Sequence, residues 1–385
     1  MTRPTDRPPT APPTGRTRLG YIDDLRTALT VLVVVHHAAI TYSTIPRWYY
    51  EEPVTDSSAT LLDILVVLNQ SFFMGAFFLI SGFFVPGALD RRGARGFIGE
   101  RLLRLGVPLL IWVLVVRVPV TVGPYIEARD LAVAQGSDLP YWRFYLESVN
   151  PGPMWFVEVL FAFSLLYVLW RIVVPTDRSR IPATVPARAP GVVAIVGFGV
   201  GVAVVTYLWR IAVGMDDAIL GLPSPAYLPQ YAALFVVGLL AVRRGWLEAL
   251  SARAGRLGFA TAAVASVAVL ALLVLDGEAF LGGGTWQSLV MALCESALAL
   301  GAVIGLLVLF RDRAGRQGPV RRFLSAHAYA VYLVHPVVLV GVSYALRGVA
   351  APAAGKFVLL TVLSLPLCWG VAYLVRALPG ARRVF

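Results

Sequence analysis

The sequence is poor in lysine, cysteine and histidine, and it contains few charged residues of any kind. Only 14% of its 385 residues are charged, whereas 58% are hydrophobic. Soluble domains average about 25% charged and about 45–50% apolar residues. This small number of charges cannot cover so much apolar surface in water. The composition therefore excludes an ordinary soluble domain and favours a protein of the lipid bilayer.

The two cysteines, Cys294 and Cys368, both lie inside apolar segments. Two cysteines in such positions provide neither a disulfide framework nor a metal-binding pattern. No Walker loop, dinucleotide-binding glycine pattern or zinc signature is found either. The sequence therefore predicts no metal site and no permanently bound cofactor.

Almost all positive charge comes from arginine, because Lys356 is the single lysine among 33 basic residues. The net charge of +11 raises the possibility of a nucleic-acid partner. However, the arginines form short clusters between long apolar runs, without the basic stripe and interleaved aromatics of a nucleic-acid surface. The pattern indicates membrane topology and no nucleic-acid binding.

Apolar segments long enough to cross a bilayer recur along the whole chain. A transmembrane helix needs about 20 residues, at a rise of about 1.5 Å per residue. We therefore predict an all-α, polytopic transmembrane helical bundle of about ten spans. The predicted spans lie near residues 22–44, 62–86, 105–124, 153–174, 191–212, 228–243, 257–276, 287–310, 323–346 and 355–376.

Basic residues alternate between the connections of these predicted spans. One set of connections carries 25 of the 33, and the other set carries 5. Since basic residues accumulate on the cytoplasmic side, both termini are predicted to be cytoplasmic in a multi-pass protein of the cell membrane. We expect a disordered Pro-rich tail over residues 1–19, a membrane domain over 20–376 and a short cytoplasmic tail over 377–385.

The first span places a cation and an imidazole on one helix face. Arg26 and His37 are eleven residues apart, so they differ by about 20° around the axis and by about 16 Å along it. His36 is turned about 80° from Arg26. Because a charged group inside the bilayer costs about 2.5–3.5 kcal/mol on insertion scales, each needs a partner or a function. We predict a chemical role for His37 rather than His36, the alternative for either being a helix–helix hydrogen bond.

Polar residues in other predicted spans fall into one layer with His37, roughly 8–12 Å below the outer surface. They are Asn69, Gln70, Arg117, Glu158 and Glu295. His335 is expected deeper, near the middle of the membrane. The layer suggests a polar cavity in the outer half, and the alternative is that Arg117 pairs with Glu158 or Glu295 only to hold the bundle together. Chemical and structural roles both stay open for the two glutamates.

A pair of arginines follows the second predicted span. Arg101 and Arg104 are three residues apart, so they share a helix face at the membrane edge. The guanidinium group suits phosphate recognition. Alternatively, the pair is a topology determinant or a contact to anionic lipid.

Five segments, in this order along the chain, resemble motifs of one family. Together they resemble the acyltransferase-3 family of integral membrane acyltransferases. The resemblance covers about residues 20–376, nearly the whole chain. They are Arg26-x10-His37, the stretch Phe72–Phe83, Arg101-x-x-Arg104-x-x-x-Pro108, Pro153-Met154-Trp155-Phe156, and Ser325-x-x-x-Tyr329-x-x-Tyr332-Leu333-Val334-His335-Pro336.

The resemblance implies an O-acyltransferase that moves an acyl group from cytoplasmic acyl-CoA to a hydroxyl. The acceptor would be a carbohydrate or another glycosylated molecule, as in O-acetylation of the cell envelope, and Arg26 and His37 would be essential. Its partners would then be acyl-CoA as donor substrate, this acceptor and the lipid bilayer.

On this interpretation His37 acts as general base on the acceptor hydroxyl, because a neutral imidazole can take a proton at physiological pH. Arg26 steers the CoA or stabilises developing negative charge. Glu158 or Glu295 orients the imidazole, and His335 completes the candidate catalytic set. Arg101 and Arg104 are the expected binding residues for the CoA phosphates.

The alternative function is a transporter or flippase for a polyisoprenoid-linked sugar or a drug-like anion. A third hypothesis is a non-catalytic membrane scaffold. Transporters often show internal repeats and broken helices in both halves. No convincing repeat is found here, and the shared helix face of Arg26 and His37 favours the enzyme.

Overall fold

The computed structural model describes a chain that is helical and without strands throughout its described residues. The predicted all-α bundle is therefore confirmed, whereas the predicted tail over residues 1–19 lies outside the described part. The structure describes residues 20–45, 48–53, 56–174, 188–215, 217, 219, 221–222, 225–313 and 318–385. The long helices are α1 (Gly20–Tyr42), α2 (Ala59–Gln70), α3 (Phe73–Arg101), α8 (Trp155–Val173), α9 (Val192–Ala212), α10 (Leu228–Arg244), α12 (Ala252–Phe280), α13 (Trp286–Asp312), α14 (Pro319–Leu346) and α15 (Ala353–Ala377).

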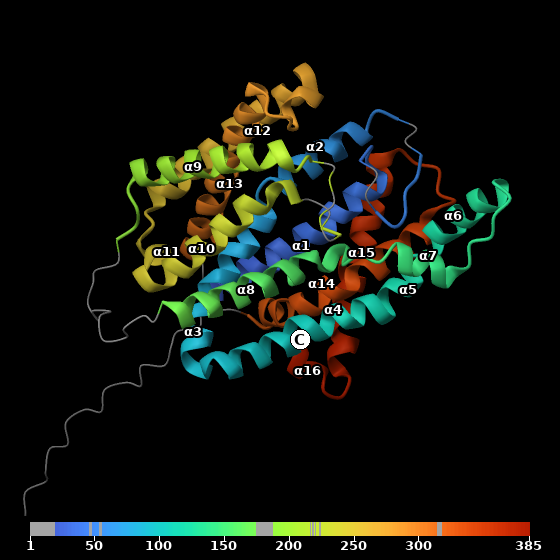
Figure 1. The fold of residues 1–385 in the computed structure, drawn as a ribbon, viewed down its shortest axis with the longest axis horizontal. Coiled ribbons are helices and arrows are strands. Elements are labelled where there is room, and N and C mark those ends of the chain that lie inside the picture. The colour runs from blue at the N-terminus through green and yellow to red at the C-terminus, as the bar shows by residue number, and fades with distance from the viewer. Residues whose placement is uncertain are drawn as a thin grey trace, which may run out of the picture.

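Within the described residues, nine helical segments are long and apolar enough to cross a membrane. One of them, Ala59–Val120, has 62 residues, far more than a single span needs. Gly93 interrupts it with non-helical backbone angles (φ 69°, ψ 171°). In Figure 1 the ribbon turns at the end of α3 and runs back, so this segment accounts for two of the ten predicted spans. The returning part consists of η1 (Leu102–Gly106), α4 (Val107–Ile111), η2 (Trp112–Val116) and α5 (Arg117–Val120).

Helix α1 lies at the centre of the bundle and contacts α2, α3, α13, α14 and α15 (Figure 1). Its buried apolar residues recur at helical spacing, as in Leu25, Leu29 and Val33. This spacing keeps one apolar stripe against the neighbouring helices. The central helix is thus held on several sides, which fixes the direction of the polar groups that it carries.

Two helix crossings depend on glycine because the backbones approach closely. A Cβ atom added at Gly301 of α13 would lie 2.6 Å from the carbonyl oxygen of Gly258 in α12. A Cβ atom at Gly82 of α3 would collide with the carbonyl oxygen of Phe235 in α10. Small residues at such crossings are the common basis of helix packing in membranes, where no hydrophobic effect drives association between helices.

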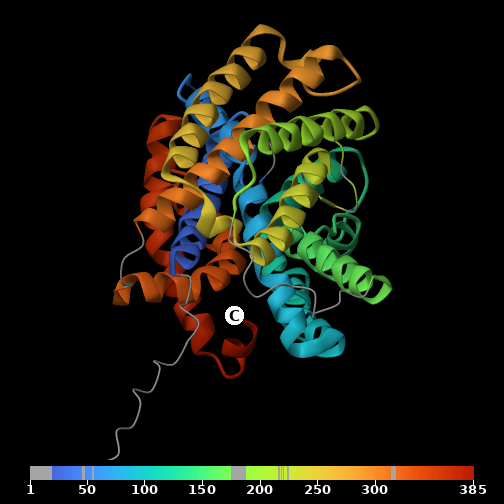
Figure 2. The same cartoon turned by 90° about the vertical axis from the view of Figure 1, so that its left-hand side faces the viewer.

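The two ends of the bundle differ in charge. Among the described residues, arginines cluster in the last part of α3, where α10 and α13 end, where α12 and α14 begin, and in the short helix α16 (Ala381–Val384), and we call this the basic end. Helix α16 packs beside η1 at this end (Figure 2). The opposite end carries α6 (Val122–Ala134), α7 (Tyr141–Glu147) and the described residues of the loop between α1 and α2, which are 43–45, 48–53 and 56–58.

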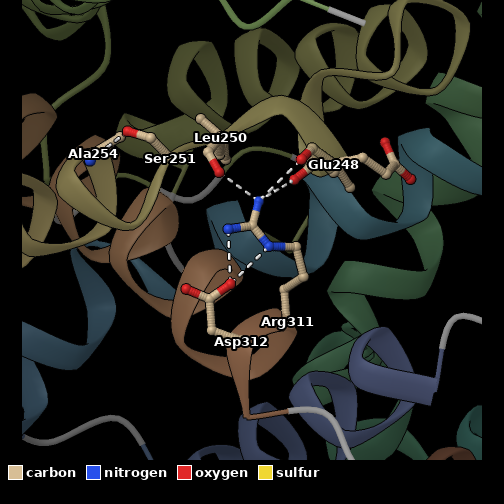
Figure 3. A network of polar contacts seen from close by, with 7 residues as sticks. Glu248, Leu250, Ser251, Ala254, Arg311 and Asp312 are labelled. Carbon is tan, nitrogen blue, oxygen red and sulfur yellow. Dashed lines mark hydrogen bonds and ion pairs between the residues drawn. The ribbon is translucent and has the colours of Figure 1, made fainter.

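Some arginines of the basic end hold the fold together. The Nη1 atom of Arg311 donates to the carbonyl oxygens of Leu247 (3.0 Å) and Leu250 (2.5 Å), at the end of α11 (Trp246–Ala249). Its Nε and Nη2 atoms bind the Asp312 carboxylate at 2.9 and 2.8 Å (Figure 3). The guanidinium group therefore satisfies carbonyl groups that a helix end leaves without partners, and ties α13 to α11.

Candidate functional site

A cavity of about 830 Å³ opens at the basic end, between α1, α3, α8 and α14. Its lining has a charged part with a net positive charge and an apolar part, which suits a long ligand with a charged end and a less polar arm. The charged wall consists of five arginines and two carboxylates: Arg26, Arg91, Arg92, Arg101, Arg104, Asp23 and Glu100. The apolar wall includes Met74, Phe77, Ile80, Phe156 and Leu160.

The structure brings Arg26, Arg101 and Arg104 to this one cavity, although Arg26 belongs to α1. Arg101 ends α3, and Arg104 lies in the π-helical turn η1, a feature that is frequent at functional sites. Arg104 lies 3.4 Å from the Glu100 carboxylate. The Arg101 guanidinium stacks over the Phe97 ring at 4.9 Å, and its buried Nε atom has no hydrogen-bond partner. Such a donor is available to an anionic ligand.

Two histidines from different helices meet in the interior. The ring centroids of His37 in α1 and His335 in α14 are 4.9 Å apart. The Trp48 ring lies against His37 at 4.3 Å. His36 is buried and faces Phe73 instead, at 4.9 Å. The two neighbouring histidines thus face different side chains, and neither of them lines the cavity.

Backbone hydrogen bonds set the tautomer of both imidazoles. The Nδ1 atom of His37 lies 2.9 Å from the carbonyl oxygen of Val33, and that of His335 lies 2.7 Å from the carbonyl oxygen of Tyr332. Because a carbonyl oxygen only accepts, each Nδ1 atom is assigned the proton, and each Nε2 atom keeps a lone pair. The Nε2 atom of His335 is buried and has no partner. The pair therefore offers two proton acceptors in a non-aqueous interior.

The contact between His37 and His335 fits the small difference in depth that was expected for them. Counted from the outer ends of their spans, the two residues differ by about four residues, or roughly 6 Å along the membrane normal. Ring centroids 4.9 Å apart are compatible with that difference.

The predicted polar layer divides into separate local contacts. Arg117 pairs with neither glutamate: its Nη2 atom donates to Ser148 Oγ at 2.8 Å and its Nη1 atom to the Tyr145 carbonyl oxygen at 3.3 Å. Glu295 instead forms a buried ion pair with Arg210 at 2.6 Å and accepts from the Tyr227 hydroxyl at 2.7 Å. These partners come from loops and helices whose packing the sequence does not reveal.

Glu158 lies in the first turn of α8, and its buried Oε2 atom has no partner. Among the described residues, neither Glu158 nor Glu295 forms a hydrogen bond or ion pair with His37, so the expectation that one of them orients this imidazole is wrong. The carbonyl oxygen of Val33 orients the His37 imidazole instead. Val33 lies one helical turn before His37, so its carbonyl oxygen is within reach of the Nδ1 atom.

Tyr332 separates the cavity from the histidine pair. It lines the cavity, and its ring lies 5.9 Å from His335 and 6.0 Å from Phe156. Its hydroxyl donates to the carbonyl oxygen of Pro153, before α8. In the sequence, Tyr332 stands out only as part of a motif, and Trp48 does not stand out at all, because a loop residue has no helical periodicity.

These features define a multi-pass membrane protein with an arginine-lined cavity and a pair of imidazoles next to Tyr332, one of the residues that line it. No group of three or more metal-ligating side chains lies together in the part of the chain that the structure describes. The family comparison is in line with this site. The chain belongs to the acyltransferase-3 family, whose model, described as an acyltransferase domain, matches residues 19–373. It is therefore a membrane acyltransferase, with an acyl donor and an acceptor. Neither a curated protein nor a solved structure matches the chain.

Proposed function

We propose that this acyltransferase takes its acyl group from acyl-CoA and transfers it to a hydroxyl of a carbohydrate or another glycosylated acceptor. The cavity at the basic end is the single observation that carries the proposal. Guanidinium groups on one wall suit the phosphates of CoA, and the apolar wall suits the pantetheine arm and acyl chain.

Arg101 and Arg104 are the proposed phosphate ligands, and Arg26 lines the same cavity from α1. The position of Arg26 on the central helix suits it to steer the CoA arm toward the interior or to stabilise negative charge during transfer. With the phosphates held at the rim, the thioester end points toward Tyr332, the residue between the cavity and the histidines.

His37 is the proposed general base. Its Nε2 lone pair takes the proton of the acceptor hydroxyl as the hydroxyl oxygen forms a bond to the acyl carbon. The carbon–sulfur bond then breaks, and the CoA thiolate takes the proton from the imidazolium, which restores the neutral ring. The His335 ring lies beside this ring, with centroids 4.9 Å apart, and supplies a second acceptor for a hydroxyl group.

We propose that the basic end faces the cytoplasm at the cell membrane, with both termini there. The cationic connections at that end support this orientation, because basic residues accumulate on the cytoplasmic side. The donor then enters from the cytoplasm, and the acceptor reaches the histidines from the opposite end.

The test is thioester turnover by the purified protein in lipid nanodiscs. Acetyl-CoA and a panel of sugars and glycosides are supplied, and free CoA and acylated product are measured. We expect free CoA to appear in an acceptor-dependent manner and to be lost in His37→Ala. Uptake of an acceptor into proteoliposomes without any CoA release would contradict the proposal and favour the transporter.

A further inference from the structure

In the described part of the loop between α1 and α2, Trp48 places an aromatic ring against the histidine pair, at the end opposite the cavity. The Trp48 ring lies 4.3 Å from His37, at an interplanar angle of 34°. It lies 6.2 Å from His335 and nearly parallel to it, at 20°. Of α1, the cavity reaches only Asp23, Arg26 and Thr30. The two imidazoles therefore lie between Tyr332 on the cavity side and Trp48 on the other.

Contacts of the described loop residues to α15 and α2 hold Trp48 in place. The Asp56 carboxylate accepts from the backbone N–H of Ala353 and the Ser58 hydroxyl accepts from that of Ala354, both at 2.9 Å, at the beginning of α15. Glu52 forms an ion pair with Lys356, the single lysine. These contacts pin the loop to a helix that packs directly against α1.

Further contacts lie on both sides of Trp48 within the loop. The backbone N–H and the hydroxyl of Thr44 both donate to the Asp63 carboxylate of α2, at 2.8 Å. The backbone N–H of Trp48 donates to Glu51 at 3.3 Å, and the Tyr50 hydroxyl donates to Glu52 at 2.6 Å. The ring is thus held by its own loop, and its position does not depend on His37 alone.

Polar atoms without partners gather around this ring. The indole Nε1 atom of Trp48 is buried and has no hydrogen-bond partner, and the same holds for Nε2 of His335, a residue that is 0% exposed. Leaving a buried donor and a buried acceptor unmatched costs free energy, so such groups call for an explanation. A ligand oxygen that accepts from the indole and a ligand hydroxyl that donates to the imidazole would satisfy both.

We propose that Trp48 is a positioning residue on the acceptor side of the active site. It holds the His37 ring in place and excludes water from it, and it presents its indole N–H to an oxygen of the incoming acceptor. This inference rests on the proposed function of His37 as general base, and it adds the residue that decides whether an acceptor hydroxyl or water attacks.

Water exclusion matters because water competes for the same step. If water reaches His37, its oxygen bonds to the acyl carbon, the carbon–sulfur bond breaks, and the proton passes through His37 to the CoA thiolate. The products are free CoA and the carboxylic acid instead of the acylated acceptor. Exclusion of water is a common way in which enzymes prevent such side reactions.

The experiment measures the ratio of hydrolysis to transfer in nanodiscs with acetyl-CoA and the best acceptor found. In Trp48→Ala we expect this ratio to rise at least tenfold and the KM for the acceptor to rise, with the KM for acetyl-CoA unchanged. Trp48→Phe keeps a ring over His37 but loses the N–H, so the acceptor KM should rise with little gain in hydrolysis. Trp142→Ala is the matched control, because Trp142 on α7 is 66% exposed.

A second pair of variants keeps the idea testable if Trp48→Ala is not stably folded. Lys356→Gln and Asp56→Asn weaken the attachment of the loop and should shift the ratio in the same direction, by a smaller factor. An unchanged ratio in a folded Trp48→Ala, or equal losses in the KM for both substrates, would overturn the inference.

Chemical accessibility separates this inference from the proposed function. Diethyl pyrocarbonate reacts with a neutral imidazole, and mass spectrometry reads the modification at His37. We expect faster modification of His37 in Trp48→Ala than in wild type or Trp142→Ala. Faster modification in a protein that never releases CoA would refute the acyl-CoA proposal but support the shielding role of Trp48. Equal modification rates in all three proteins would refute that role, whatever the activity.

Discussion

Replacement of the two neighbouring histidines of α1 tests the site most directly. His37→Ala removes the ring that faces His335 and Trp48 and whose Nε2 lone pair is the proposed proton acceptor. His36→Leu removes a buried ring that faces Phe73, and leucine fills a similar volume. The two changes lie one residue apart on one helix, so they share insertion and expression demands but differ in the face that they alter.

The structure sets the expected magnitudes. Loss of a positioned general base lowers turnover by about 10²–10⁴-fold, which corresponds to about 3–5 kcal/mol in the activation free energy. His36→Leu removes a polar atom, Nδ1, that has no partner in the interior, so its effect on turnover should stay within about threefold.

The assay is acceptor-dependent release of free CoA, normalised to monodisperse protein in nanodiscs. An inactive His36→Leu beside an active His37→Ala would refute the assignment outright. Severe and equal losses in both would show that the two rings act together and that helix phase is too simple an argument. Full activity in both variants would exclude His37 as the general base and would favour the transporter hypothesis.

Three other predictions follow from the same geometry. Replacing both Arg101 and Arg104 by Gln should raise the KM for acetyl-CoA at least tenfold and leave the KM for the acceptor unchanged. If only membrane insertion changes, the two arginines have a role in topology instead. Arg210→Met should lower stability by about 3–5 kcal/mol because it leaves Glu295 buried and unpaired, whereas adding Glu295→Leu should recover most of the loss, as thermal unfolding in detergent would report. A reporter fused after Phe385 should give a cytoplasmic signal, and a signal from the other side would contradict the even number of spans.

Several features of the site were predictable because they depend on one helix at a time. The 20° offset between Arg26 and His37 needs only helical geometry, and it predicts that His36 and His37 face different neighbours, as they do in the structure. The spacing of Arg101 and Arg104 likewise placed both on one surface, which is now a wall of the cavity.

Features that involve two segments were predicted poorly. Arg117 and Glu295 were each assigned a partner by depth, but depth leaves open which of many helices is adjacent. Their actual partners are Ser148 after α7, and Arg210 in α9. Trp48 could not be found at all, since a loop has no periodicity from which a direction can be calculated.

The sequence by itself determined that this chain is a membrane helical bundle with an arginine-rich end. Composition, span length and charge asymmetry follow from the transfer of single side chains and single helices into lipid, and they need no knowledge of neighbours. Only the tertiary structure decided that His37 meets His335, that Tyr332 stands between them and the cavity, and that Trp48 covers them from the other side. Those contacts depend on close approach of helix backbones and on the path of loops, which are properties of the whole packed bundle.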